Sequence, residues 1–454
     1  MILFVILMLI NCTVPNEMLF DYRFDMGGFP VNALDVLLGL LFLQQVFAPG
    51  RDKFHTERTH PLLYWSLGLL VAAMFFGIAG AAIGGTGVRQ YVTALRNLAT
   101  LPASIFIGYT LLKNPQRVKP INYIWLFGSV LSAIALLFLI RETGEMVAQG
   151  KSLDELRLIR YGGDTGLAAA GLLAFALVSR IRLLPRALTL GLFLLTVAGV
   201  FAPPHRGAYV TGVLILMFSA LVLPRVPVGR RFGLATVGAL VIGSTLLSGA
   251  IMMSRLTGRD FKTYVIEKRL KQLAPWLDEE TKVTVTGTRL PGIIAELKVW
   301  SESPLIGQGF AISTRVEAET GMELGMNHNV WTSALAQYGP VGFFAFAVPL
   351  VGAAVVGWRM VRAQTDLQTT ILGALAAIMG TTAVIWATLS LSINQQRLAM
   401  LFGLMFGMAF RCRAMQLTLA KQQAEWAYGQ GYDDYAEYDQ DYPSLQHPSS
   451  SLRY

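Results

Sequence analysis

The sequence has little charge and few of the residues that form disulfides or histidine-rich sites. Charged residues make up 14% of its 454 positions and hydrophobic residues 54%, and there are two cysteines and five histidines. The mean hydropathy is +0.51. Soluble globular domains carry about 25% charged residues, so this composition excludes that class. We therefore expect a polytopic membrane protein.

Long apolar runs predict about twelve transmembrane helices, because a hydrocarbon core about 30 Å thick needs roughly 20 apolar residues per span. The expected spans are Met1–Val14, Asn32–Val46, Pro61–Gly85, Leu98–Leu112, Ile121–Ile140, Thr165–Val178, Ala187–Ala202, Gly207–Leu223, Leu234–Met253, Pro340–Trp358, Leu367–Leu391 and Leu398–Phe410. The first run has no basic n-region and no small-residue cleavage site, so we interpret it as a retained span rather than a signal peptide. The predicted fold class is all-α: a polytopic membrane protein of about twelve transmembrane helices with a large outer loop that carries short helices.

The short loops indicate the orientation of the chain, since loops rich in Lys and Arg stay in the cytoplasm. Basic clusters follow every second span, at Arg51–Arg58, Lys113–Lys119, Ser179–Arg186, Arg225–Arg231, Arg359–Arg362 and Arg411–Arg413. Both termini are therefore expected in the cytoplasm. The formal net charge of +9 gathers on that face, so it follows from topology and gives no reason to expect nucleic acid as a partner. Cys12 and Cys412 fall on opposite sides of the membrane in this arrangement and cannot pair.

Hydropathy divides the chain into four parts. Residues 1–253 form an N-terminal transmembrane bundle, 254–327 a large outer loop, 328–413 the C-terminal transmembrane helices and 414–454 a cytoplasmic tail. The tail is acidic, rich in tyrosine and poor in aliphatic residues, so it is expected to be largely disordered. A plain solubilising tail, a binding segment for a regulatory partner and a target of tyrosine phosphorylation are the alternatives for it.

The outer loop contains two segments with helical periodicity. Residues 261–277 show a pattern typical either of a helix lying on the membrane surface or of an amphipathic helix packed on its neighbours. Residues 290–300 repeat apolar side chains at helical spacing, and Pro291 suits a first helical turn. Arg289 therefore precedes a helix N-terminus, whose free N–H groups and positive dipole end favour an anion, and it is a candidate phosphate clamp.

The turn after this second helix, "SESPLIGQGF", contains Pro304, Gly307 and Gly309. The turn ends the helix, and its glycines let the backbone approach another group closely. It lacks the lysine and the strand-to-helix context of a nucleotide-binding loop.

Several basic residues lie at outer span ends, where the charge rule disfavours them. Arg206, beside His205, falls in a very short hairpin between two spans, and Arg160 and Arg397 lie at other outer ends. Charged groups near lipid are costly and are therefore often functional. The alternative for Arg160 and Arg397 is that they snorkel to lipid headgroups.

One of the five histidines, His328, lies between Asn327 and Asn329 where the polar loop gives way to an apolar run. The expected topology brings it to the same side of the membrane as Arg206 and Arg289, although the three residues come from separate segments. The alternative is a histidine at a helix cap with no role in chemistry.

Other catalytic arrangements find no support in the sequence. The acidic run Asp278–Glu280 is better interpreted as a solvated loop than as a cation site, because three adjacent acids point in different directions. The pattern gives neither a Ser-His-Asp triad nor a cysteine nucleophile. We therefore predict no metal site and no cofactor.

Three segments in the second half of the chain carry a family resemblance. These are "HRGAYVTGVLIL", "TRLPGIIAELKVWSESPLIGQGF" and "NHNVWTSALAQYGPVGFFAF", in this order. Together they resemble the O-antigen ligase and O-antigen polymerase superfamily of bacterial polytopic membrane glycosyltransferases. The most specific part is the "PLIGQGF" turn followed by a histidine flanked by asparagines and a Gly-Pro turn.

The resemblance implies an inverting, metal-independent transfer of glycan from an undecaprenyl-diphosphate donor to an acceptor hydroxyl. The reaction would take place on the periplasmic face of the bacterial inner membrane, so the outer loop would be periplasmic. Arg206 and Arg289 would hold the diphosphate and neutralise its developing charge. His328 would position the acceptor hydroxyl or remove its proton. Asn329 or Asn327 would cap the following helix and fix the imidazole.

The resemblance also supplies expectations for further residues and for partners. The expected substrate-binding residues are Arg160, His205, Asn329, Gly307, Gly309 and Arg397. The expected partners are the undecaprenyl-diphosphate-linked glycan and the lipid bilayer, with chain-length regulators or export proteins as further candidates.

Several functions remain open at this point. Our first interpretation is a polymerase of exopolysaccharide or O-antigen, and the alternative is a ligase that transfers glycan to lipid A core or to protein. A flippase for lipid-linked oligosaccharide should carry ionisable groups or broken helices near mid-membrane, whereas the polar groups here collect at outer ends. A scaffold of an export complex would not need two arginines and a histidine. The motifs do not distinguish the sugar, the linkage or the acceptor.

Overall fold

The computed structural model describes residues 1–14, 24–26, 29–47, 59–83, 88–113, 115–148, 163–179, 181–201, 206–224, 243, 292–309, 329–389 and 396–437. The helices are α1 (Ile2–Thr13), α3 (Ala33–Phe47), α4 (Pro61–Ile83), α5 (Val88–Leu111), α6 (Val118–Ala148), α7 (Gly163–Ser179), α8 (Arg186–Phe201), α9 (Arg206–Met217), α14 (Val330–Ala363), α15 (Leu367–Leu389) and α16 (Gln396–Glu437). Shorter elements are the 3₁₀ turn η1 (Pro115–Arg117), the π-helix η3 (Phe218–Val222), the strands β1 (Phe24–Met26) and β2 (Phe29–Val31), and a helix at residues 292–302.

Eleven of the expected spans coincide with helices of this structure, and the span expected at 234–253 lies outside the described residues except for residue 243. Among the described residues, five helical stretches are long and apolar enough to cross a membrane: Pro61–Ile83, Pro115–Leu137, Val330–Ala363, Leu367–Thr388 and Arg397–Glu425. Six further apolar helices are shorter. The helical, membrane-spanning character is therefore confirmed in the described residues, and the number of twelve spans stays a prediction.

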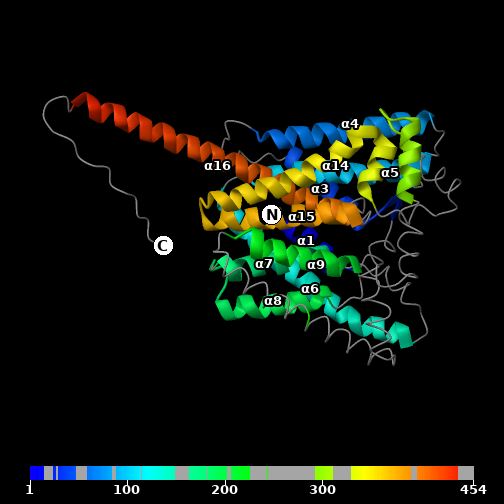
Figure 1. Ribbon diagram of the computed structural model, residues 1–454, viewed down its shortest axis with the longest axis horizontal. Helices are drawn as coiled ribbons and strands as arrows, with labels where there is room; N and C mark the ends of the chain where they lie inside the picture. The colour runs from blue at the N-terminus through cyan, green and yellow to red at the C-terminus, as the bar shows by residue number, and fades with distance from the viewer. Residues whose placement is uncertain are drawn as a thin grey trace.

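The helices form an elongated bundle in which α15 and α16 lie near the centre (Figure 1). Large side chains such as Phe402, Phe406 and Phe410 are fully buried along α16. Gly403 and Gly407 let this helix approach α5 closely, since a Cβ at Gly407 would lie 2.0 Å from the carbonyl oxygen of Ile105. Small residues at a helix interface commonly permit such packing in membrane proteins.

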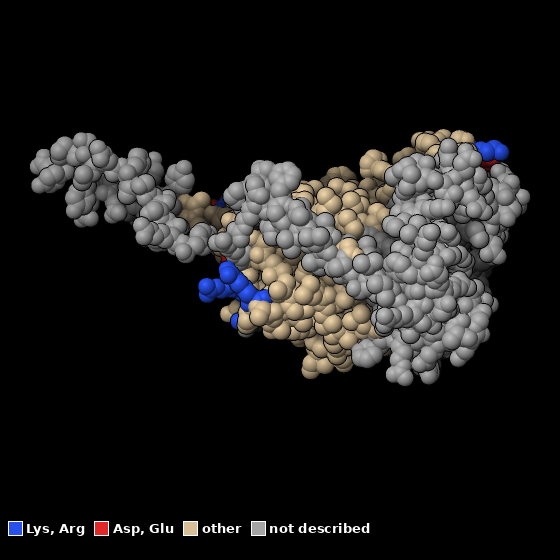
Figure 2. Space-filling view, turned by 60° about the horizontal axis from the view of Figure 1, so that its bottom comes forward, with Lys and Arg blue, Asp and Glu red and all other residues tan. Residues whose placement is uncertain are grey.

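Basic side chains gather at the end of the bundle from which α16 projects (Figure 2). We call it the basic end. Hydrogen bonds from Arg117 to Leu111, from Arg411 to Leu112 and from Arg362 to Val222 tie helix termini together there. The described basic residues of this end are Lys113, Arg117, Lys119, Arg182, Arg186, Arg359, Arg362, Arg411 and Arg413. They belong to the loops that the sequence predicts to be cytoplasmic.

A short hairpin departs from the all-α prediction. β1 and β2 pair antiparallel, with Phe24 opposite Val31 and Met26 opposite Phe29. The Gly-Gly pair at positions 27 and 28 is the sequence pattern of a two-residue hairpin. Long apolar runs do not reveal such a short hairpin.

The C-terminal helix is longer than expected. α16 continues to Glu437 and so includes residues 414–437, and the largely disordered cytoplasmic tail expected at 414–454 stays a prediction. The stretch from Ala420 to Glu425 consists mainly of good helix formers, and Lys421 pairs with Glu425 one turn later at 3.3 Å. The remaining tail, residues 438–454, lies outside the described residues.

Candidate functional site

The segments that carry the family resemblance lie at the end of the bundle opposite the basic end. α9 begins at Arg206, and the π-helix that continues it ends at Val222, whose carbonyl accepts a hydrogen bond from Arg362 at the basic end. α14 likewise runs from Val330 to Ala363, and its last turn, with Arg362, lies at the basic end. The starts of α9 and α14 therefore lie at the opposite end (Figure 1).

Four of the nine predicted site residues have described side chains or backbone turns: Asn329, Gly307, Gly309 and Arg397. For Arg206 the structure places only the backbone, as the first residue of α9. The others, His328, Arg289, Arg160 and His205, lie outside the described residues, as does the amphipathic segment expected at residues 261–277.

Asn329 is the N-cap of α14. Its side-chain oxygen accepts hydrogen bonds from the backbone N–H groups of Trp331 at 2.9 Å and Thr332 at 3.2 Å. An N-cap residue satisfies N–H groups that have no partner within the helix. The predicted cap is thus confirmed for Asn329, and it fixes where the chain turns into the helix immediately after His328.

The helix at residues 292–302 and the turn that follows it pack directly on the first half of α14. The helix at residues 292–302 ends before Pro304, as expected, and the Trp300 indole donates a hydrogen bond to the Pro304 carbonyl at 3.0 Å. The Gln308 N–H donates to the carbonyl of Ala336 at 2.8 Å. Ala336 also packs with Ala295 and Val299 in a small buried cluster.

The two glycines of the turn approach the chain's own backbone. Both have φ +71°, and a Cβ at Gly307 would lie 2.6 Å from the backbone nitrogen of Tyr338. A Cβ at Gly309 would lie 2.4 Å from the backbone nitrogen of Ala81, in α4. Only glycine adopts this conformation readily and leaves room for the neighbouring chain. The turn therefore packs the segment at residues 292–309 against both α14 and α4.

A kink divides α14 at the Gly-Pro pair of the third motif. Gly339 has φ 65° and ψ −160°, and Pro340 follows it. The carbonyl oxygen of Leu305 would lie 2.4 Å from a Cβ at Gly339. The span expected from Pro340 is therefore the second half of α14. The first half, residues 330–339, packs on the segment at residues 292–309.

Sequence reasoning missed a buried carboxylate in this segment. Glu296 is 1% exposed, and its carboxylate accepts hydrogen bonds from the hydroxyls of Thr332 and Ser333 in the first turn of α14. Among the apolar residues at helical spacing, Ile294 is 56% exposed, whereas Glu296 is buried. The only local signal is a glutamate among apolar neighbours, because its partners lie 36 and 37 positions away.

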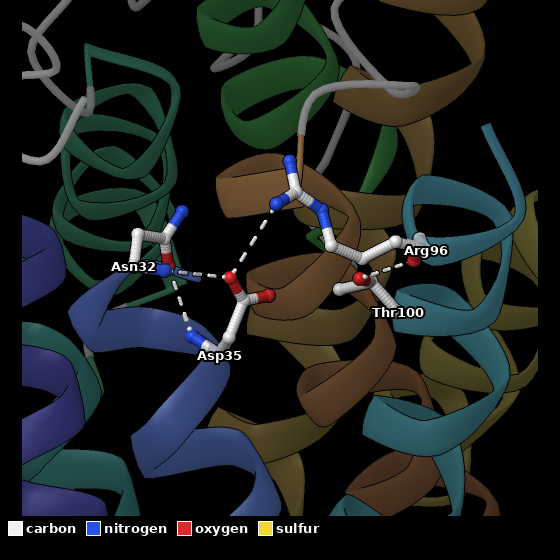
Figure 3. Close-up of polar contacts among 4 residues, drawn as sticks. All are labelled: Asn32, Asp35, Arg96 and Thr100. Atoms are coloured by element: carbon white, nitrogen blue, oxygen red, sulfur yellow. Dashed lines mark hydrogen bonds and ion pairs between the residues drawn. The ribbon is translucent and has the colours of Figure 1, made fainter. Parts of the chain in front are cut away.

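A second polar cluster at this end involves α3 and α5 (Figure 3). Asn32 and Asp35 cap the start of α3 reciprocally: each side chain accepts from the other's backbone N–H at 2.9 Å. Arg96 of α5 points toward Asp35, with 3.6 Å between guanidinium nitrogen and carboxylate oxygen. The missed signal was the spacing of an N-cap residue and an acid three positions later.

Arg397 lies near the N-terminus of α16 and is 5% exposed. Its guanidinium donates a hydrogen bond to the carbonyl of Val14, the C-cap residue of α1, at 3.1 Å. Burial excludes the alternative that Arg397 snorkels to lipid headgroups. The contact ties the start of α16 to the end of α1.

The described side chains contain no group of three or more His, Cys, Asp and Glu residues that could hold a metal ion.

Part of the chain matches a known protein family. Residues 191–347 match the family model described as O-antigen ligase. This region is similar to the O-antigen ligase family. No curated protein matches the chain. The matched region runs from α8 through α9 and the 292–309 segment to the middle of α14, and it contains the positions of Arg206, Arg289 and His328. The resemblance indicated by the three sequence motifs is thus confirmed over these residues.

Proposed function

We propose that this protein is a membrane glycosyltransferase that joins undecaprenyl-diphosphate-linked glycan repeat units on the periplasmic face of the bacterial inner membrane. The family domain supports the O-antigen ligase and polymerase type of transferase, and the apolar helices support a membrane protein. The observation that carries the proposal is the placement of the motif segments at the end opposite the basic end. Because basic loops stay in the cytoplasm, that placement favours a site at the outer surface.

In the proposed reaction, Arg206 and Arg289 bind the diphosphate of the lipid-linked donor. Arg206 is the first residue of α9, where the free N–H groups and the positive end of the helix dipole favour an anion. Two planar guanidinium groups can each make paired hydrogen bonds to phosphate oxygens and neutralise the charge of the leaving group. Arg160 and His205 are further proposed contacts of the substrate.

His328 is the proposed base. An imidazole with a pKa near neutrality can accept the proton of the acceptor hydroxyl as that oxygen attacks the anomeric carbon. The sugar inverts its configuration, and undecaprenyl diphosphate leaves without help from a metal. The cap at Asn329 supports this role because it fixes the backbone directly after His328.

A ligase is the second candidate, and the description of the matching family favours it. Donor and chemistry would be the same, and the acceptor would be lipid A core or a protein side chain instead of another lipid-linked repeat. The two candidates predict different lipid-linked glycans when the enzyme fails.

The test is the lipid-linked glycan profile of membranes from cells that carry His328→Ala, compared with wild type and a deletion at matched protein level. Accumulation of single repeats with loss of long chains supports a polymerase. Accumulation of long chains still attached to the lipid supports a ligase. His447→Ala, in the C-terminal tail, is the matched control and should behave as wild type. A wild-type profile for His328→Ala would remove this histidine from the mechanism.

A further inference from the structure

The buried carboxylate of Glu296 joins two parts of the proposed site. Each of its oxygens accepts a hydrogen bond from one hydroxyl of α14: Oε2 from Thr332 and Oε1 from Ser333. Both hydroxyls belong to the turn that Asn329 caps. A carboxylate that is 1% exposed would be strongly destabilising without such donors.

The carboxylate of Glu296 complements the partial positive charge at the N-terminus of α14, although it belongs to another helix. The N-terminus of a helix carries a partial positive charge, and an acidic residue in the first turn stabilises it. α14 has no acidic residue in its first turn. Glu296 supplies the negative charge from the helix at residues 292–302, so the contact specifies how these two helices align.

The two helices continue directly from the residues that the proposed mechanism uses. Glu296 follows Arg289 by seven positions, and Thr332 follows His328 by four. Other described contacts between this segment and α14 include the apolar cluster of Ala295, Val299 and Ala336, and the backbone hydrogen bond from Gln308 to Ala336. Apolar contacts tolerate small sliding movements, whereas paired hydrogen bonds to a carboxylate fix direction and distance.

We propose that Glu296 is a positioning residue that holds the segment bearing Arg289 in register with the segment bearing His328. This inference rests on the proposed function. This polar contact then helps to align the donor diphosphate with the acceptor hydroxyl. Loss of the contact leaves the arginines able to bind the diphosphate but misaligns the acceptor relative to it.

The test uses the purified full-length protein in lipid nanodiscs, with undecaprenyl-diphosphate-linked repeat unit as substrate. Glu296→Gln keeps the size of the side chain and removes its charge. We expect kcat to fall about tenfold or more, with KM for the lipid-linked substrate within about twofold, because misplaced reactants affect the chemical step. The number of binding sites for undecaprenyl diphosphate per protein should equal that of wild type, which shows that the variant is folded.

Combining substitutions of Glu296 with substitutions of its two hydroxyl partners tests whether they act through the same contact. Thr332→Val with Ser333→Ala should reduce kcat to a similar extent, and adding Glu296→Gln to this pair should cause little further loss, because all three changes remove the same contact. The exchange Thr332→Ser with Ser333→Thr keeps both hydroxyls and should retain kcat. Glu302→Gln, an exposed position on the same helix, is the matched control and should behave as wild type.

A second measurement needs no glycan. Amide hydrogen exchange in residues 292–302 should be faster in Glu296→Gln than in wild type and in Glu302→Gln, because the helix has lost its polar contact with α14. Unchanged exchange, a wild-type kcat for Glu296→Gln, or losses of kcat that multiply between Glu296 and the hydroxyls would overturn the positioning role. Inactive wild-type protein together with faster exchange in Glu296→Gln would instead refute the proposed function and leave the contact established.

Discussion

The two ends of the bundle differ in the side chains that bind the free backbone groups of helix termini. At the basic end, arginine side chains donate to carbonyls at helix C-termini, as Arg117 does to Leu111 and Arg362 to Val222. At the opposite end, amide and acidic side chains cap helix N-termini: Asn329 at α14, and Asn32 with Asp35 at α3. Both patterns complement the helix dipole.

Exceptions to this pattern have different causes at the two ends. Lys119 and Arg186 lie at helix N-termini of the basic end, where membrane topology accounts for basic residues irrespective of the dipole. Neither the dipole nor topology favours the arginines at the N-termini of α9 and α16, Arg206 and Arg397. Arg397 has a structural explanation, because it donates to the carbonyl of Val14 at the C-terminus of α1. For Arg206 the explanation that we propose is an anionic substrate.

The largest expected effect comes from the proposed diphosphate ligands. Arg289→Lys and Arg206→Lys keep the positive charge and lose paired hydrogen bonding, so glycan transfer should fall by about a hundredfold or more. Transfer rates measured at matched protein level test this, with Arg182→Lys, exposed at the basic end, as the control. If both lysine variants transfer glycan at the wild-type rate, neither arginine forms a bidentate clamp.

The cap of α14 should have the next largest effect. Asn329→Ala leaves N–H groups of Trp331 and Thr332 without their acceptor and should destabilise the protein by about 1 kcal/mol, with a lower transfer rate because the backbone after His328 is released. Asn329→Asp keeps an acceptor at the same place and should retain most of the activity. Transfer rate and Tm distinguish the variants, and equal activity in both would show that the cap has no part in the reaction.

Arg397 should affect stability rather than binding of the donor. Arg397→Met removes the hydrogen bond to Val14, and a buried hydrogen bond from a charged group contributes roughly 1.5–3 kcal/mol. We expect a lower Tm with an unchanged KM for the lipid-linked substrate, as for Arg411→Met at the basic end, where Arg411 donates to Leu112. A raised KM in Arg397→Met alone would assign Arg397 to the substrate site.

The smallest expected effect concerns pH at the basic end. Burial, and then the positive charges of Arg413 and Arg359, lower the pKa of His60 below its usual 6.5. The unfolded chain then binds more protons than the folded one, so stability is fully present above pH 6.5 and is lost as the pH falls through the lowered pKa. His60→Phe keeps a ring against Phe410, which His60 stacks on at 5.7 Å, and should reduce the loss of Tm on acidification. An identical pH dependence in both proteins would contradict this assignment.

Local patterns predicted the parts of the structure that local physics determines. The described apolar runs are helices, as predicted. Asn329 caps α14, and the helix at residues 292–302 ends before Pro304. Glu296 was overlooked because its burial depends on Thr332 and Ser333, which are distant in the chain. Arg397 was expected at a lipid boundary because the sequence shows the end of its own helix and not the carbonyl of α1 that it meets.

We propose that the region similar to the O-antigen ligase family catalyses transfer from a lipid diphosphate with His328 as the base. The most direct measurement adds undecaprenyl-diphosphate-linked repeat unit to the purified protein in nanodiscs and follows both chain length and released undecaprenyl diphosphate. We predict longer lipid-linked chains and one released lipid diphosphate per bond formed in wild type, and neither product in His328→Ala. Equal yields from the two proteins, or release of the lipid diphosphate without any new glycosidic bond, would contradict the account.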